Sequence, residues 1–143
     1  MQTITEYMAG GHKVCDDEFA IAEKASYTRE WSVAKSAFNT FRDDMAHHFR
    51  IEEEVLFPEL VSAGGPAGPV HIMCMEHTQI NELLDQMAAA LANEDTQEYQ
   101  GLSETLLMVM QQHNLKEEQI LYPIADRVLS AERESVLNRM QQA

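Results

Sequence analysis

Six His and Glu side chains form two sets in this sequence, and each member of the second set lies 65 positions after its counterpart in the first. The six residues are His12, His48, Glu52, His77, His113 and Glu117. Imidazole nitrogens and carboxylate oxygens together suit borderline to hard transition-metal ions. We therefore interpret the chain as a duplicated half-site that holds a pair of metal ions.

The copy is closest around the second element of each set. Residues 48–58 and 113–123 share the pattern His-x3-Glu-Glu-x-[Val/Ile]-Leu-[Phe/Tyr]-Pro. A His and a Glu four positions apart on a helix differ by about 40° in direction, so both reach one cluster. A single buried His is more often a hydrogen-bonded core residue than a ligand. Six such groups buried together cost roughly several kcal/mol per ionised group unless cations balance them, so we predict bound metal.

The composition favours one domain without a nucleic-acid or membrane partner. A chain of 143 residues is the size of a single domain, which we assign to residues 1–143 with repeats at about 1–62 and 70–127. Its 45% hydrophobic content is ordinary, and no apolar run approaches the roughly 20 residues of a membrane span. A net charge of −14 argues against nucleic acid and anionic membranes, because both attract clustered Lys and Arg.

The chain's opening segment and its cysteines point to the cytoplasm. The first residues lack a basic stretch followed by an apolar one, so neither a secretory signal nor a transit peptide is visible. Cys15 and Cys74 are too few for a disulfide framework, and their helical positions put them about 9 Å apart along the bundle axis. We expect free thiols. Cys15 is either a small core residue or a redox group near the metal.

The spacing of apolar residues predicts four helices in an all-α, up-down-up-down bundle. Three glycines and two prolines between Ser62 and Pro69 mark the connection between the repeats. On both sides the apolar residues follow steps of three and four, and the six candidate ligands occupy positions of those seams. Strand patterns are absent. The further breaks expected lie at Gly10–Gly11, Tyr27–Thr28 and Asn93–Thr96.

The C-terminal segment predicts a fifth, shorter helix. Ser130 is a suitable N-cap, and Val136, Leu137 and Met140 form an apolar stripe. This stripe either packs on its own bundle or contributes to a dimer contact. The sequence leaves both a monomer and a homodimer open.

These motifs together resemble the hemerythrin-like, or HHE cation-binding, family, whose members are four-helix bundles with a non-haem di-iron centre. The resemblance rests on the two His-x3-Glu-Glu segments and on the Glu76–His77 pair, and it covers nearly the whole chain. It implies two iron ions bridged by an oxide or hydroxide. It also implies a small gaseous or peroxide ligand, and an electron donor if the ligand is turned over.

One position departs from the oxygen-carrying members of the family. They have a fifth His four residues before the position of His77, where this sequence has Met73. Because thioether sulfur is a poor ligand for hard iron, we expect Met73 to be a core residue that shapes the ligand cavity. The remaining four His and two Glu are similar to the set of the iron-centre repair proteins, whose separate cysteine-bearing N-terminal segment has no counterpart here.

Several residues near the six candidates have weaker claims to be ligands. Glu118 competes with Glu117, but five helical positions turn a side chain about 140° away from His113. Glu53 and Glu54 are either partners outside the ligand shell or a solvated face. His47 and His71 do not share the ligand face.

The sequence therefore leaves three classes of function. The first is a di-iron protein that binds or reacts with O2 or NO in sensing, scavenging or a stress response. The second is an enzyme that repairs iron-sulfur centres or reduces NO or peroxide. The third is a metal-storage or helical interaction protein without gas chemistry. Turnover with a reductant separates the first two, and lack of any reaction with gases indicates the third.

Overall fold

The computed structural model describes residues 2–143, and these residues form helices and turns without strands, which confirms the all-α prediction. Five helical rods follow one another along the chain. Two of the rods contain a π-helical turn, η1 or η2, between two α-helical parts. The elements are α1 (Ile4–Tyr27), α2 (Trp31–Ile51), η1 (Glu52–Leu56), α3 (Phe57–Ser62), α4 (Ala67–Ala92), α5 (Thr96–Lys116), η2 (Glu117–Leu121), α6 (Tyr122–Val128) and α7 (Arg133–Gln142).

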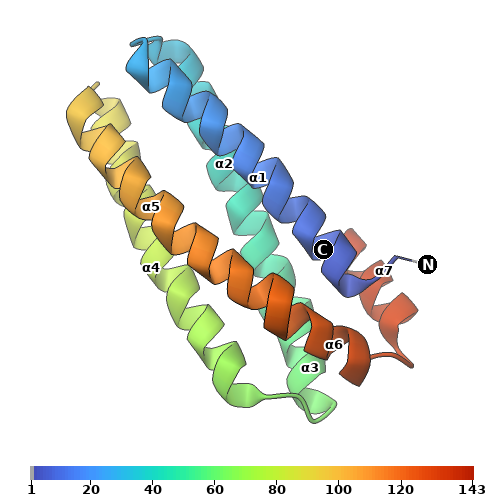
Figure 1. Cartoon of the computed structure of the whole chain (residues 1–143). Coiled ribbons are helices and arrows are strands. Elements are labelled where there is room, and N and C mark those ends of the chain that lie inside the picture. The colour runs from blue at the N-terminus through green and yellow to red at the C-terminus, as the bar shows by residue number, and fades with distance from the viewer. Residues whose placement is uncertain (1) are drawn as a thin grey trace.

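The four long rods lie side by side, and α7 packs across one end (Figure 1). Helix α1 contacts α2 and α5, and α4 contacts α2 and α5. Two apolar clusters fill the interior. One includes Phe38, Leu84 and Leu106 near the α1–α2 turn, and the other includes Met8 and Leu60 near α7. Along each long rod the candidate ligands fall between these two clusters, so they form a polar layer within an apolar core.

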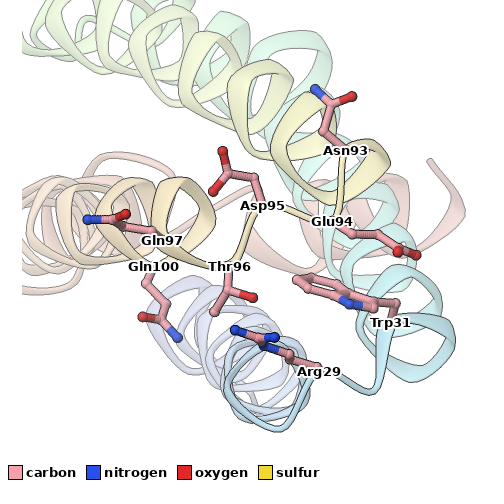
Figure 2. A pocket seen from close by; sticks show the side chains of 8 residues that line it. All are labelled: Arg29, Trp31, Asn93, Glu94, Asp95, Thr96, Gln97 and Gln100. Carbon is pink, nitrogen blue, oxygen red and sulfur yellow. The ribbon is translucent and has the colours of Figure 1, made fainter.

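The turns at the far end of the bundle fall where the sequence predicts them. The turn between α1 and α2 uses Arg29 and the turn between α4 and α5 uses Glu94, both with positive φ. Asp95 caps α5 by accepting a hydrogen bond from the Glu98 N–H. These two turns enclose an open, polar hollow of about 720 Å³ that includes Arg29 and Trp31 (Figure 2). None of the six candidate ligands lines it.

The predicted break at Gly10–Gly11 is wrong, because α1 continues from Ile4 to Tyr27. The reason for a glycine at position 11 is tertiary rather than local. A Cβ atom there would lie 2.9 Å from Nδ1 of His48, which is closer than a side chain tolerates. Gly11 thus allows α1 to approach the His48 ring, and the rest of the helix offsets the low helix propensity of glycine.

Each Glu of the repeated motif begins a π-helical turn. The N–H of Phe57 bonds the carbonyl of Glu52, and the N–H of Tyr122 bonds the carbonyl of Glu117. The following residue is Pro58 or Pro123, which lacks an N–H and clashes with the carbonyl four residues before it, so a wider turn relieves both problems. A bond between residues five apart also brings their side chains to the same face.

Two boundaries differ from the sequence prediction. Helix α7 begins at Arg133 with Glu132 as its cap, so the prediction of Ser130 as N-cap is wrong; Ser130 lies in the preceding turn. The connection between the repeats is shorter than Ser62–Pro69, because Pro69 lies in the first turn of α4, where a missing N–H costs nothing. The apolar stripe of α7 is buried against its own chain.

Across residues 2–143, no helix combines the length and the apolar character that spanning a lipid bilayer requires.

Candidate metal centre

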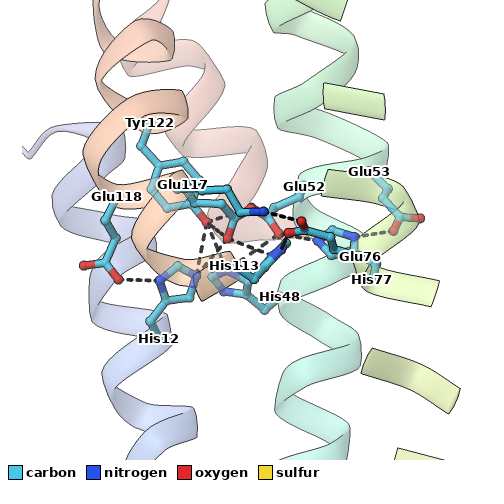
Figure 3. Close-up of polar contacts among 11 residues, drawn as sticks. His12, His48, Glu52, Glu53, Glu76, His77, His113, Glu117, Glu118 and Tyr122 are labelled. Atoms are coloured by element: carbon cyan, nitrogen blue, oxygen red, sulfur yellow. Dashed lines mark hydrogen bonds and ion pairs between the residues drawn. The ribbon is translucent and has the colours of Figure 1, made fainter. Parts of the chain in front are cut away.

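The structure brings all six sequence-predicted side chains together in the middle of the bundle (Figure 3). They form two groups in which the potential ligand atoms lie within 4.8 Å of one another. Glu117 belongs to both groups. One group is Glu52, His77, His113 and Glu117, and the other is His12, His48 and Glu117. All six are buried, which is unusual for groups that carry charge unless something compensates them.

The Nε2 atoms of the histidines point at the two carboxylates. Nε2 of His77 lies 3.1 Å from Oε1 of Glu52, and Nε2 of His113 lies 3.2 Å from Oε1 of Glu117. Nε2 of His12 is 3.1 Å from the same oxygen of Glu117. The corresponding distance from His48 to Glu52 is longer, at 3.9 Å. Each carboxylate therefore faces two imidazoles, and only Glu117 belongs to both groups of potential ligands.

Three of the four imidazoles are hydrogen-bonded through Nδ1, the ring nitrogen that points away from the cluster, to a carboxylate outside the cluster. Nδ1 of His12 donates to Glu118 at 2.8 Å, Nδ1 of His77 donates to Glu53 at 2.6 Å, and Nδ1 of His113 donates to Glu76 at 2.8 Å. An ionised carboxylate only accepts, so the ring proton sits on Nδ1 and the lone pair of Nε2 faces the centre. This arrangement is typical of metal-binding histidines.

Several nitrogen and oxygen atoms of the layer have no hydrogen-bond partner among the described residues, and such atoms are available to bind a metal ion. They include Nε2 of His77, Nε2 of His113, Oε1 of Glu52 and Oε2 of Glu117. Their close contacts lack hydrogen-bond geometry. Buried polar atoms are nearly always satisfied, so converging lone pairs without protons between them call for a cation. The donor set of imidazole and carboxylate fits iron or a similar divalent ion.

The electrostatics of the layer lead to the same conclusion. Burial, followed by the neighbouring Glu117 carboxylate, raises the pKa of Glu52 well above its usual value. Burial opposes the charge of Glu117 too, but the neighbouring Glu52 carboxyl and then the His113 ring outweigh it and lower the pKa of Glu117. Without a cation, Glu52 therefore favours its neutral form and Glu117 its charged form.

The histidines of the layer respond differently to their surroundings. Burial, reinforced by the nearby His12, lowers the pKa of His48 to about 3, so this ring is neutral at neutral pH. A neutral imidazole is the form that binds metal. Burial opposes the charge of His113, but the Glu117 carboxylate close to its Nε2 outweighs burial and raises the pKa of His113.

Tyr122 is a residue of the site that the sequence interpretation did not single out. Its hydroxyl lies 2.7 Å from Oε2 of Glu52 and 2.9 Å from Oε1 of Glu117, and it is fully buried. The π-helical turn explains this position, because it places Tyr122 on the same face as Glu117, five residues earlier. The only signal in the sequence was the Phe or Tyr that precedes the proline of each motif.

The weaker sequence candidates lie outside the cluster. Glu118 and Glu53 contact the backs of His12 and His77, so both act as outer partners and Glu54 is exposed. Nε2 of His47 contacts the carbonyl of Ala143 at 2.9 Å. His71 is exposed, and Met73 is buried in the apolar cluster near α7. Cys15 and Cys74 are free thiols.

Comparison with known proteins agrees with the geometry. The model of the hemerythrin HHE cation-binding domain matches residues 3–125, which include all six clustered residues and both π-helical turns. No curated protein and no solved structure matched the chain. A match over most of the chain, together with a buried His and Glu cluster that fits a metal, establishes the family. The chain belongs to the hemerythrin HHE cation-binding domain family.

Proposed function

We propose that this up-down-up-down bundle holds two non-haem iron ions and binds or reacts with O2 or NO, in gas sensing, scavenging or a response to oxidative or nitrosative stress. The observation that carries the proposal is the set of buried, unpartnered Nε2 and carboxylate atoms that converge in two groups. The proposed ligands are His12, His48, Glu52, His77, His113 and Glu117. Their shared member, Glu117, is the candidate bridge between the ions.

The protein's own residues orient and isolate the ions. Glu118, Glu53 and Glu76 fix three imidazole rings with Nε2 turned inward. The apolar clusters on both sides keep bulk water from the layer, which strengthens the interaction of the carboxylates with cations. Bound ferrous iron would supply an electron-rich centre with affinity for O2, NO or peroxide.

The count of protein ligands leaves room for such a molecule. Four imidazoles and two carboxylates do not fill the coordination shells of two six-coordinate ions. The position that carries a fifth histidine in oxygen-carrying relatives is Met73 here, and its side chain belongs to the apolar cluster. We therefore propose that the ligand is a small neutral molecule. We also propose that the protein is cytoplasmic.

The first test is an anaerobic titration of the metal-free protein with ferrous iron, followed by exposure to O2 or NO. We expect saturation at two ions per chain and a change in the absorption spectrum on adding the gas. Replacing Glu117 with Ala should abolish stoichiometric binding, whereas Glu104→Ala, an exposed glutamate on α5, should not change it. Saturation below two ions, or two ions with no response to either gas, would contradict the proposal.

Turnover separates reversible binding from an enzymatic role. If the loaded protein consumes NO or peroxide repeatedly in the presence of a reductant, an enzyme is indicated and an electron donor becomes a required partner. If the spectrum returns to its starting form when the gas is removed under argon, reversible binding is indicated.

A further inference from the structure

The two halves of the metal centre are not equally covered. The side chains of His77 and His113 are 1% and 2% exposed, whereas those of His12 and His48 are 7% and 8% exposed. These differences are small, but they divide the centre along the line between the repeats. The half formed by α1 and α2 is the one closer to solvent.

Aromatic rings close the half formed by α4 and α5. The ring of Phe49 stacks on His77 with the ring centroids 3.8 Å apart, and its edge approaches His113 at 6.2 Å. Phe57 lies parallel to His77 on another side at 6.1 Å. The residue that corresponds to Phe49 in the other repeat is Asn114, so the half with His12 and His48 lacks a counterpart of the Phe49 stack and has only the Tyr122 ring, 5.7 Å from that of His12.

The outer carboxylates show the same difference. Glu76 covers the back of His113, and the position that corresponds to Glu76 in the first repeat is Gly11. Gly11 leaves Nδ1 of His48 without a carboxylate partner among the described side chains. The His48 ring occupies the place that a side chain at position 11 would take.

Gly11 and His48 both line a cavity of about 210 Å³ between α1 and α2. Its walls include Tyr7, Gly11, Val14, Asp44, His48 and Ile51. The Nδ1 and Cε1 atoms of His48 face Gly11 in this cavity, while Nε2 on the opposite side of the ring lies 3.3 Å from the Tyr122 hydroxyl. The His48 ring therefore has one edge in the cavity and the other at the centre. A volume several times the roughly 30 Å³ of a water molecule accommodates O2 or NO.

We propose that a small uncharged ligand reaches the centre through this cavity on the α1/α2 face, past the ring of His48, and that the half containing His77 and His113 is closed to it. This inference rests on the proposed function. It adds the side from which the ligand arrives and the class of ligand admitted.

The charge of the walls explains the restriction to uncharged molecules. Asp44 lines the cavity, and its carboxylate is close to that of Glu18 on the neighbouring helix. The whole chain carries a net charge of −14. Anions such as azide are repelled by a negative wall of this kind, whereas O2 and NO are not.

Another hollow offers a competing route. An apolar groove of about 180 Å³ between α4 and α5 includes Ile72, Met73 and Ile120. None of the six clustered residues lines it, and the buried side chain of Met73 forms its inner wall. The α1/α2 cavity is favoured because His48 itself is part of its wall.

The internal repeat provides a matched pair of variants. Val14 is 51% exposed at the cavity and belongs to no proposed ligand, so Val14→Trp narrows the opening without touching the centre. Its counterpart in the other repeat is Gln79, which is also exposed, and Gln79→Trp is the control. Ile72→Trp tests the competing groove. Iron stoichiometry is measured on each variant first.

The readout is the rate constant for association of NO with the iron-loaded protein, followed by stopped-flow absorption. Val14→Trp should slow association by about tenfold, and Val14→Ala should increase its rate, while Gln79→Trp and Ile72→Trp match the unmodified protein. Equal rates for all four variants, or slowing only in Ile72→Trp, would overturn the route. Asp44→Asn should accelerate association of azide but not of NO, and an unchanged azide rate would overturn the charge selection.

A second readout does not depend on ligand chemistry. Crystals of the metal-loaded protein pressurised with xenon should show xenon beside Gly11, and Val14→Trp should remove it. Xenon only in the Ile72 groove would overturn the route. If the unmodified protein holds two irons but binds no NO, the proposed function fails, and the xenon result still reports on the cavity alone.

Discussion

The two repeats present the same three inward side chains but surround them differently. The first repeat places Gly11 beside His48, where the second places Glu76 beside His113. The first repeat also has Phe57 where the second has Tyr122, and only the second has a hydroxyl at the carboxylates. The duplicated ligand pattern thus fixes where metal binds. The neighbouring residues that differ between the repeats decide which half of the centre is covered and which is open.

A second difference lies one turn beyond the layer. Glu18 and Asp44 of the first repeat are neighbouring carboxyl groups at the α1/α2 cavity, which Asp44 lines. The corresponding residues of the second repeat, Leu83 and Val109, pack against the apolar core. The open half is therefore bordered by charge and the closed half by hydrocarbon.

The largest change in stability should come from removing the ring of Phe49, which covers the half of the centre that contains His77 and His113. Phe49→Ala should lower the free energy of unfolding by about 3–5 kcal/mol, because it deletes a buried ring that packs on His77. The matched change in the other repeat, Asn114→Ala, should cost about 0.5 kcal/mol or less. Urea unfolding of the metal-free proteins measures both. Similar losses in the two variants would remove the asymmetry.

The outer carboxylate of the closed half should contribute strongly to metal affinity. Glu76→Ala should weaken iron binding by about 10- to 100-fold, since it frees the His113 ring that Glu76 orients. Glu76 also pairs with Lys116, so Lys116→Ala serves as a control that leaves the His113 bond in place. Competition with a coloured chelator gives the affinities. If both variants bind iron equally well, Glu76 acts only through its surface ion pair.

Tyr122→Phe makes the two repeats alike at this position, because Phe57 is the counterpart. The change removes the one hydroxyl that lies within hydrogen-bond distance of both buried carboxyls, so the metal-free protein should lose about 1–3 kcal/mol of stability. Bound cations neutralise those carboxylates, so the loss should shrink in the loaded protein. Thermal unfolding of both forms tests this, with the exposed Tyr27→Phe as control. An equal loss in both forms would count against the role of the hydroxyl.

The smallest expected change is in the pH dependence of the melting temperature, and it concerns the neighbouring carboxyl groups of Glu18 and Asp44. Burial, followed by the neighbouring Asp44 carboxylate, raises the pKa of Glu18 from 4.5 to about 7. A raised pKa stabilises the fold at low pH, and that contribution is lost as the pH rises through about 7. Glu18→Gln should therefore match the unmodified protein near pH 4.5 and melt higher at pH 8. A pH-independent difference in melting temperature would show that Glu18 and Asp44 do not share a proton.

Much of the fold was predictable because its pattern is local. Steps of three and four along the chain predict helices whose seam includes His48 and Glu52, and the Gly and Pro cluster predicts the connection between repeats. The prediction of a break at Gly10–Gly11 is wrong because glycine has two structural roles in helices. It interrupts isolated helices, but here Gly11 makes room for a ring from another helix, and no local rule distinguishes these.

The surroundings of the site were less predictable. The sequence left Glu53 between an outer partner and a solvated face, and it gave no reason to single out Tyr122. The proline after each motif was the available signal for a π-helical turn, and such a turn moves the residue five positions on to the ligand face. Contacts across helices depend on how each helix is rotated, which spacing along one helix does not fix.

The duplicated set of His and Glu and the helical faces that carry them were predictable from the sequence, because residue type and helical period are local properties. The packing of the helices against one another placed Glu117 in both groups, stacked Phe49 on His77 and brought the His48 ring against Gly11. These outcomes depend on side chains from different helices that meet at one depth. Their distances follow from the packing of the whole bundle.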